Sequence, residues 1–211
     1  MPDDRLILPR DRLLTAFQGP GIDPPSLDDG DDGFGWLRQS KDVRPERIVS
    51  AAVLVPLVDR ADGLTVLLTR RAGHLKSHAG QVSFPGGKTE AHDDSPEATA
   101  LRETEEETGI GRDRIEPIGR LGRRTTGTGF QVTPVVGVVR PPFDLAPDPG
   151  EVDTIFEVPL SFVLDSANHK TETRLIQGLE REFYVMPYGE FYIWGLTARL
   201  LVALRNTLGA T

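Results

Sequence analysis

The sequence predicts a mixed α/β domain, because strand-type and helix-type patterns alternate irregularly along most of the chain. Two β-branched and leucine-rich runs, 48–58 and 64–70, flank the turn sequence ADG, which is typical of an antiparallel strand pair. A helix is expected after Ser95, since a serine N-cap, a proline at the first helical position and Glu97 in the first turn mark helix starts. Leucines at helical intervals over 196–208 predict another helix that packs on the body.

Shorter signals predict the remaining elements. Gly109 is expected to end the helix that begins after Ser95, because glycine readily adopts the left-handed conformation of a helix C-terminus. Residues 74–87 are interpreted as a loop. Further strands are expected at 115–121, 131–139, 174–177 and 182–186, and a short helix is expected at 159–165.

The chain is expected to divide into an N-terminal extension, residues 1–47, and a domain, residues 48–211. Within the extension, a helix is plausible around 10–18, and the Gly-, Pro- and Asp-rich sequence that follows is typical of a loop. Three roles stay open for this acidic segment: a lid, a loose tail, or an arm that holds together a homodimer.

Composition excludes several classes of protein. The 211 residues contain no cysteine, which excludes disulfides, thiolate zinc sites and a cysteine nucleophile and fits a reducing compartment. The N-terminus lacks the apolar core of a signal peptide, and the longest apolar run, 48–58, is too short to span a bilayer. We therefore expect a cytoplasmic protein that acts without a membrane. A net charge of −8 argues against nucleic acid as a partner, and a phosphorylated substrate would need metal ions to mediate its contacts.

The stretch RETEEETGI, residues 102–110, crowds glutamates into two turns of the expected helix. Because each helical residue advances by about 100°, Glu103, Glu106 and Glu107 share one face, while Glu105 points toward solvent. Three convergent carboxylates suit Mg²⁺ or Mn²⁺, and the neighbouring Arg102 can hold one of them by a bidentate pair. A solvated acidic face is the alternative interpretation when the run is considered alone.

The context upstream favours the metal site. FPGGKTEAHDDSPEATALRETEEETGI, residues 84–110, resembles the Nudix box, in which a glycine precedes an acid and an Arg-Glu-x-x-Glu-Glu centre at set offsets. Two departures occur: Asp94 follows Gly87 after six residues instead of five, which leaves Asp93 or Asp94 as the acid, and Thr104 replaces an apolar residue. The matching residues are Gly87, Arg102, Glu103, Glu106, Glu107, Gly109 and Ile110.

The resemblance implies a Nudix fold, with a mixed β-sheet between helices, and metal-dependent hydrolysis of a diphosphate linked to another group. It also implies that Glu103, Glu106, Glu107 and the carbonyl of Gly86 bind Mg²⁺ or Mn²⁺, while Arg102 orients the carboxylates. The general base varies among such enzymes. Glu106 is the first candidate here, and Glu151, in a Pro- and Gly-rich loop, is the second.

A second stretch indicates the substrate. LLTRRAGHLKSHAGQVSFPGG, residues 67–87, resembles the accessory motif of coenzyme A pyrophosphatases, with Lys76 in place of an arginine. Residues 128–137 and 150–165 are similar to later segments of that subfamily. The resemblance implies that coenzyme A or a derivative is hydrolysed to 4′-phosphopantetheine and adenosine 3′,5′-bisphosphate. The residues expected to contact this substrate are Arg70, Arg71, Lys76, Gly80 and Phe84.

Two alternatives remain at this stage. One is a domain that acts on ADP-ribose, a dinucleoside polyphosphate or an oxidised nucleotide, and the other is a Nudix-like ligand sensor without turnover. The second is disfavoured because all the box glutamates are present and no basic helix-turn-helix follows.

Overall fold

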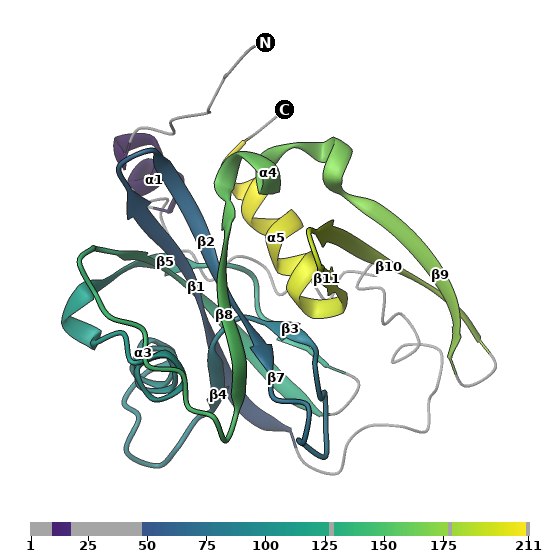
Figure 1. Cartoon of the computed structure of the whole chain (residues 1–211), viewed down its shortest axis with the longest axis horizontal. Coiled ribbons are helices and arrows are strands. Elements are labelled where there is room, and N and C mark those ends of the chain that lie inside the picture. Colours follow the sequence, from purple (N-terminus) through teal and green to yellow (C-terminus); the bar gives the residue numbers. More distant parts are fainter. Residues whose placement is uncertain (1–9, 18–47, 127–128, 177–178, 210–211) are drawn as a thin grey trace.

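The computed structural model describes residues 10–17, 48–126, 129–176 and 179–209 (Figure 1). In these residues an eight-stranded mixed sheet carries helices on both faces, and a separate three-stranded antiparallel sheet lies beside it. The predicted α/β class, with a mixed sheet between helices, is therefore confirmed. No helix in this part of the chain combines the length and the apolar composition needed to cross a lipid bilayer.

Strand β1 (Val49–Arg60) lies at the centre of the main sheet. It runs parallel to β7 (Phe130–Val139) along one edge, and along its other edge it pairs antiparallel with β2 (Gly63–Arg71) and β4 (Gly86–Lys88). Because β1 is covered on both faces, its sequence is a nearly continuous apolar run. The outer strands are β3 (Val82–Ser83) and β8 (Val152–Pro159) beside β2, and β5 (Ile115–Arg120) and β6 (Arg124–Thr125) beside β7.

Helix α3 (Pro96–Thr108) covers one face of the main sheet, and the other helices lie on the opposite side (Figure 1). Those helices are α1 (Arg10–Phe17), α4 (Leu160–Leu164) and α5 (Gly195–Thr207). The smaller sheet is formed by β9 (Lys170–Ile176), β10 (Leu179–Tyr188) and β11 (Phe191–Trp194). Single 3₁₀ turns occupy Arg112–Arg114 and Ser166–Asn168.

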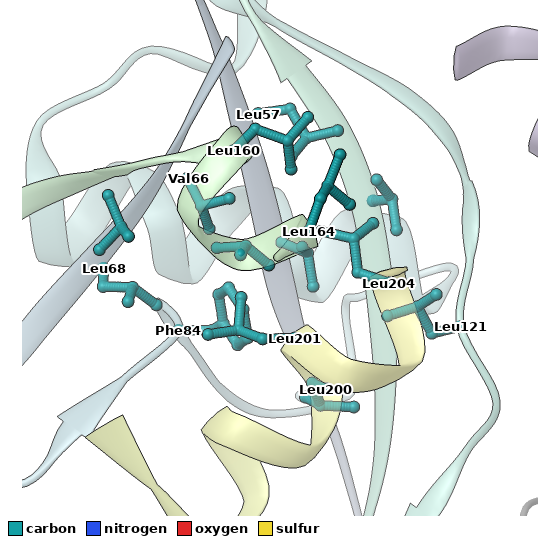
Figure 2. Close-up of a cluster of buried hydrophobic side chains, with 14 of the residues drawn as sticks. Leu57, Val66, Leu68, Phe84, Leu121, Leu160, Leu164, Leu200, Leu201 and Leu204 are labelled. Carbon is teal, nitrogen blue, oxygen red and sulfur yellow. The ribbon is translucent and has the colours of Figure 1, made fainter. Parts of the chain in front are cut away.

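The two faces of the sheet bury separate hydrophobic clusters. The larger cluster fills the side of α4 and α5, where Phe84, Leu201 and Leu204 pack together (Figure 2). The smaller cluster lies under α3 and includes Ala100 and Ile110. Most of the apolar stabilisation therefore comes from the side opposite α3.

Most predicted elements are present. Ser95 Oγ accepts a hydrogen bond from the Ala98 backbone N–H at 3.1 Å, and Gly109 ends α3 with φ at 77°, as the sequence predicted. The strand pair β1–β2 and the helices α4 and α5 are confirmed as well. The predicted helix near residues 10–18 is α1, whose Leu13 and Phe17 enter the larger cluster.

Some expectations were wrong. The loop expected at 74–87 contains β3 and begins β4, while β8 and β11 were not predicted, and β9 begins at Lys170 instead of residue 174. Strands as short as β3 carry little local signal, because their stability comes from pairing with a neighbour that is distant in sequence. The division at residue 47 stays a prediction, since most of the expected extension lies outside the described residues.

Candidate active site

Helix α3 presents its acidic residues beside the sheet because its apolar and threonine side chains anchor it. Ala100, Thr104 and Thr108 are fully buried, and Thr104 Oγ1 donates a hydrogen bond to the Ala100 carbonyl at 2.6 Å. The hydroxyl at a position where the Nudix pattern has an apolar residue is thus satisfied within the helix. On the outer side, the Glu105 side chain is 43% exposed, as expected, and forms a surface ion pair with Arg112 at 2.7 Å.

Gly86 and Gly87, at the start of β4, let the sheet approach α3 closely. Gly86 has φ at 153° and pairs with Val53, and a Cβ there would collide with the backbone of β1. A Cβ on Gly87 would overlap the carboxyl group of Glu103. Gly86 therefore requires glycine for its backbone conformation and for space, whereas a side chain at position 87 would displace the Glu103 carboxyl group.

Arg102 is the centre of a buried ion-pair network. Its guanidinium is 6% exposed and binds Asp93 in a bidentate pair, with Nε–Oδ1 at 3.1 Å and Nη2–Oδ2 at 2.9 Å. It also donates to Glu103 at 2.9 Å, to Glu106 at 3.1 Å and to the Lys88 carbonyl at 3.0 Å. The hydrogen bonds from Arg102 hold the pKa of Asp93 far below its ordinary value despite burial.

This network decides which acid belongs to the box. The bidentate partner of Arg102 is Asp93, and five residues separate Gly87 from Asp93, as in the Nudix pattern. The additional residue of this chain consequently falls between Asp93 and Arg102. Sequence spacing alone left Asp93 and Asp94 open, because both precede the helix.

Glu107 is a buried carboxyl group outside that network. It is 4% exposed, and burial raises its pKa to about 8, with further increases from the charges of Glu151 and Glu103. The charge of Arg71 and the backbone N–H of Gly86 act in the opposite direction. The ionised form of this buried carboxyl group therefore requires a nearby cation to be stable at neutral pH.

Glu103 and Glu151 surround Glu107. Burial raises the pKa of Glu103, Arg102 lowers it, and the charges of Glu106 and Glu151 raise it. Glu151 lies just before β8, where its carbonyl accepts a hydrogen bond from the Ala72 N–H at 2.8 Å. The structure therefore brings this distant loop acid to the acidic face of α3.

The oxygen atoms of this site are suitable ligands for a hard cation, but the carboxylates are not gathered around one point. Within the described ranges, no three acidic or histidine side chains are grouped so that they could hold a metal ion. Arg102 binds Glu103 and Glu106, and the Glu106 side chain is 57% exposed, while Glu107 is buried apart from them. Carboxylate and carbonyl oxygens are nevertheless the ligands that Mg²⁺ and Mn²⁺ prefer.

Arg70 and Arg71 project to opposite faces of β2, as successive strand residues do. Arg71 acts on Glu107, and its Nε is buried without a hydrogen-bond partner among the described residues. Arg70 instead binds Asp153 at 2.7 Å and lies over the ring of Phe191 at 5.5 Å from its centroid. Only Arg71 of this pair therefore belongs to the acidic face.

The other residues expected to contact substrate are also separated. Phe84 is 4% exposed and packs in the larger cluster, opposite α3 (Figure 2), so it supports the fold. Lys76 is exposed on the loop that joins β2 to β3. Gly80, with φ at 69°, donates its N–H to the Arg71 carbonyl at 3.1 Å and so folds this loop back on the end of β2.

Comparison with known proteins decides the family: residues 49–179 match the NUDIX domain model. The chain belongs to the Nudix family. It is 42% identical over 151 residues to a protein named "Uncharacterized Nudix hydrolase NudL" from Photorhabdus laumondii, with 72% of this chain and 80% of that protein covered. It is 38% identical over 187 residues to a protein of the same name from Shigella flexneri, with coverage of 88% and 96%. As a Nudix hydrolase, it belongs to the predicted class of pyrophosphohydrolases.

Solved structures agree with this fold. A MutT/nudix family protein from Enterococcus faecalis superposes with a TM-score of 0.52 at 21% identity, over 82% of this chain and 67% of that one. The NUDIX domain of Shewanella oneidensis NrtR, solved in complex with ADP ribose, gives a TM-score of 0.50 at 20% identity, over 79% and 94%. At this level of identity the likeness shows the Nudix fold alone.

Proposed function

We propose that this Nudix hydrolase cleaves the diphosphate of coenzyme A or one of its derivatives, giving 4′-phosphopantetheine and adenosine 3′,5′-bisphosphate. The observation that supports this substrate is the place of residues 67–87, whose sequence resembles the coenzyme A accessory motif. Arg71 from this stretch acts on Glu107, Ala72 binds the backbone of Glu151, and Gly87 lies against Glu103. The residues that suggest coenzyme A thus adjoin the acidic face.

In this proposal, Glu103, Glu106, Glu107 and the Gly86 carbonyl hold Mg²⁺ or Mn²⁺. The bound metal supplies charge neutralisation for the diphosphate and lowers the pKa of a coordinated water. Arg102 keeps Glu103 and Glu106 in place without touching the substrate.

We assign the substrate phosphates to the part of the site formed by the end of β2 and the loop that joins β2 to β3. Arg71 is the proposed phosphate ligand, because its buried Nε has no partner in the described part of the chain and remains free to donate to an anion. Lys76 is the second proposed contact, and Gly80 shapes the loop that carries it. Arg70 and Phe84 are better explained by the ion pairs and the apolar contacts that they already make.

Glu151 is favoured over Glu106 as the general base. The Glu106 carboxylate is already bound by Arg102 at 3.1 Å. The Glu151 side chain forms no ion pair with any described residue, and its charge reaches both Glu103 and Glu107. A carboxylate beside the metal ligands, and not committed to a cation, is suited to accept a proton from the attacking water.

The test is to incubate the protein with coenzyme A and Mg²⁺ or Mn²⁺ and to separate the products by chromatography. We expect adenosine 3′,5′-bisphosphate, abolished by EDTA and by Glu107→Gln, with Glu105→Gln as a matched control on the outer side of the same helix. Turnover of ADP-ribose without cleavage of coenzyme A would refute the substrate while keeping the Nudix chemistry. Binding of coenzyme A without any product would support the ligand-sensor alternative.

The cellular setting is part of the proposal. We propose a cytoplasmic enzyme whose partner is a small molecule, with no nucleic acid or membrane involved, and a homodimer as a possible assembly. Cell fractionation tests the location, and light scattering on the purified protein tests the assembly.

A further inference from the structure

The pairing of β2 with β8 contains a one-residue irregularity next to the site. The strands stay in register from Thr65–Pro159 to Arg70–Thr154, but the following pair is Arg71–Val152. Asp153 is therefore an extra residue that faces no partner on β2. Such a bulge shifts the residues that precede it on β8, here Val152 and Glu151, by one position relative to β2 and changes the direction of their side chains.

The shift determines where Glu151 lies. In an unbroken register, Asp153 would face Arg71 and Glu151 would lie opposite Gly73. With the bulge, Val152 faces Arg71, and the Glu151 carbonyl accepts the Ala72 N–H at 2.8 Å. The bulge thus draws Glu151 one residue closer to the acidic face and removes a carboxylate from the side of Arg71.

Arg70 holds the extra residue in place. Its Nε donates to Asp153 Oδ2 at 2.8 Å, and its Nη2 donates to Thr154 Oγ1 at 3.1 Å. Thr154 Oγ1 donates in turn to Asp153 Oδ2 at 3.0 Å, which closes the network. The guanidinium is also fixed by Phe191 at 5.5 Å and by Glu190 at 3.4 Å. The side chain that specifies the bulge thus lies on the face opposite the site.

We infer that Arg70 and Asp153 are positioning residues for hydrolysis: by locking the β8 bulge, they set the place of Glu151 beside Glu103 and Glu107. This inference rests on the proposed role of Glu151. It assigns to Arg70 a function that does not require contact with substrate, which accounts for a conspicuous arginine whose donors are already used by protein groups.

Stability and activity should respond differently to loss of this pair. The Arg70 and Asp153 side chains are 31% and 48% exposed, and ion pairs at such exposure contribute little to the free energy of folding. A displacement of a catalytic group by about 1 Å, in contrast, can reduce a rate roughly a hundredfold. Arg70→Gln is therefore expected to change kcat far more than the melting temperature.

The experiment combines Arg70→Gln and Glu151→Gln in a double-mutant cycle, with kcat and KM measured on the substrate that the wild-type enzyme hydrolyses fastest. We expect Arg70→Gln to lower kcat roughly tenfold or more with KM unchanged, and to cause no further loss in the Glu151→Gln background. Arg60→Gln is the matched control, because Arg60 makes a similar bidentate pair with Glu157 farther along β8 and should leave kcat unchanged.

A direct readout of position is the hydrogen exchange of the Ala72 amide, whose acceptor is the Glu151 carbonyl. Arg70→Gln should speed this exchange, and Arg60→Gln should not. A raised KM, an unchanged kcat, an unchanged Ala72 exchange rate, or an additive loss in the Glu151→Gln background would each overturn the inference. A wild-type kcat in Glu151→Gln alone would refute the role of Glu151 as general base, and the inference with it. Failure to cleave coenzyme A would refute only the proposed substrate.

Discussion

The two faces of the main sheet are packed with opposite chemistry. On the side of α4 and α5, leucines such as Leu201 and Leu204 are completely buried in an apolar cluster (Figure 2). On the side of α3, a smaller apolar cluster shares its space with buried Arg102, Asp93 and Glu107. Burial of these charges costs free energy unless each finds a counter-charge. Apolar burial on the side of α4 and α5 therefore offsets the free-energy cost of burying the charged groups of the candidate site on the side of α3.

Substitutions of the acidic residues on the α3 face are expected to have the largest effect, which is on catalysis. Glu107→Gln, or Glu106→Gln, is expected to lower kcat by orders of magnitude with the fold intact, because each removes a proposed metal ligand without changing side-chain volume. Steady-state kinetics at saturating Mg²⁺, with circular dichroism as the control for folding, measures this. Activity within a few-fold of wild type would refute the assignment of the metal ligands.

The buried ion pair should respond next most strongly. Asp93→Asn leaves the Arg102 guanidinium without its bidentate partner, and breaking such a pair costs about 3–5 kcal/mol. Asp94→Asn is the matched control and should be nearly neutral. Denaturant unfolding of both variants measures the difference, and equal midpoints would show that Asp93 is not the partner that matters.

Substitutions on the apolar face should lower the free energy of unfolding of the protein without lowering kcat. Leu201 is completely buried, so Leu201→Ala is expected to lower the free energy of unfolding by about 2–5 kcal/mol. Since Leu201 lies on the face opposite α3, kcat per folded molecule should stay at the wild-type value. Thermal unfolding together with kinetics well below the melting temperature tests both parts, and a large fall in kcat would show that the two faces are coupled.

Counted per pH unit, the smallest expected effect is the pH dependence of the free energy of unfolding of the metal-free protein. The pKa of Glu107 is raised from 4.5 to about 8, so the folded state retains this proton when the unfolded chain has lost it. The contribution of Glu107 to stability is then fully present below pH 4.5 and is lost as the pH rises through 8. The slope for one proton is at most about 1.4 kcal/mol per pH unit.

Glu107→Gln provides the control for this prediction. The difference in melting temperature between wild type and Glu107→Gln, measured in EDTA from pH 5 to pH 8, should shift steadily in favour of the variant. Mg²⁺ should reduce the difference by stabilising the wild type. A difference independent of pH would contradict the raised pKa.

Local features of this protein could be predicted from its amino-acid sequence. The serine cap, the proline and Gly109 set both ends of α3, and the glutamate spacing placed acidic residues along it, because caps and helical periodicity act within a few residues. The Nudix box and the strand pair β1–β2 were also visible, since each depends on neighbours in the chain. These signals were sufficient for the α/β class, for the family and for the enzyme class.

Contacts between groups that are distant along the chain depend on the tertiary fold. The pairing of Arg70 with Asp153, the place of Arg71 beside Glu107, and the burial of Phe84 on the far face all depend on how strands and loops are packed together. The β8 bulge that sets the position of Glu151 arises from pairing between segments about eighty residues apart. No local pattern encodes such contacts, because they are set by the side chains that the folded chain brings together from remote positions.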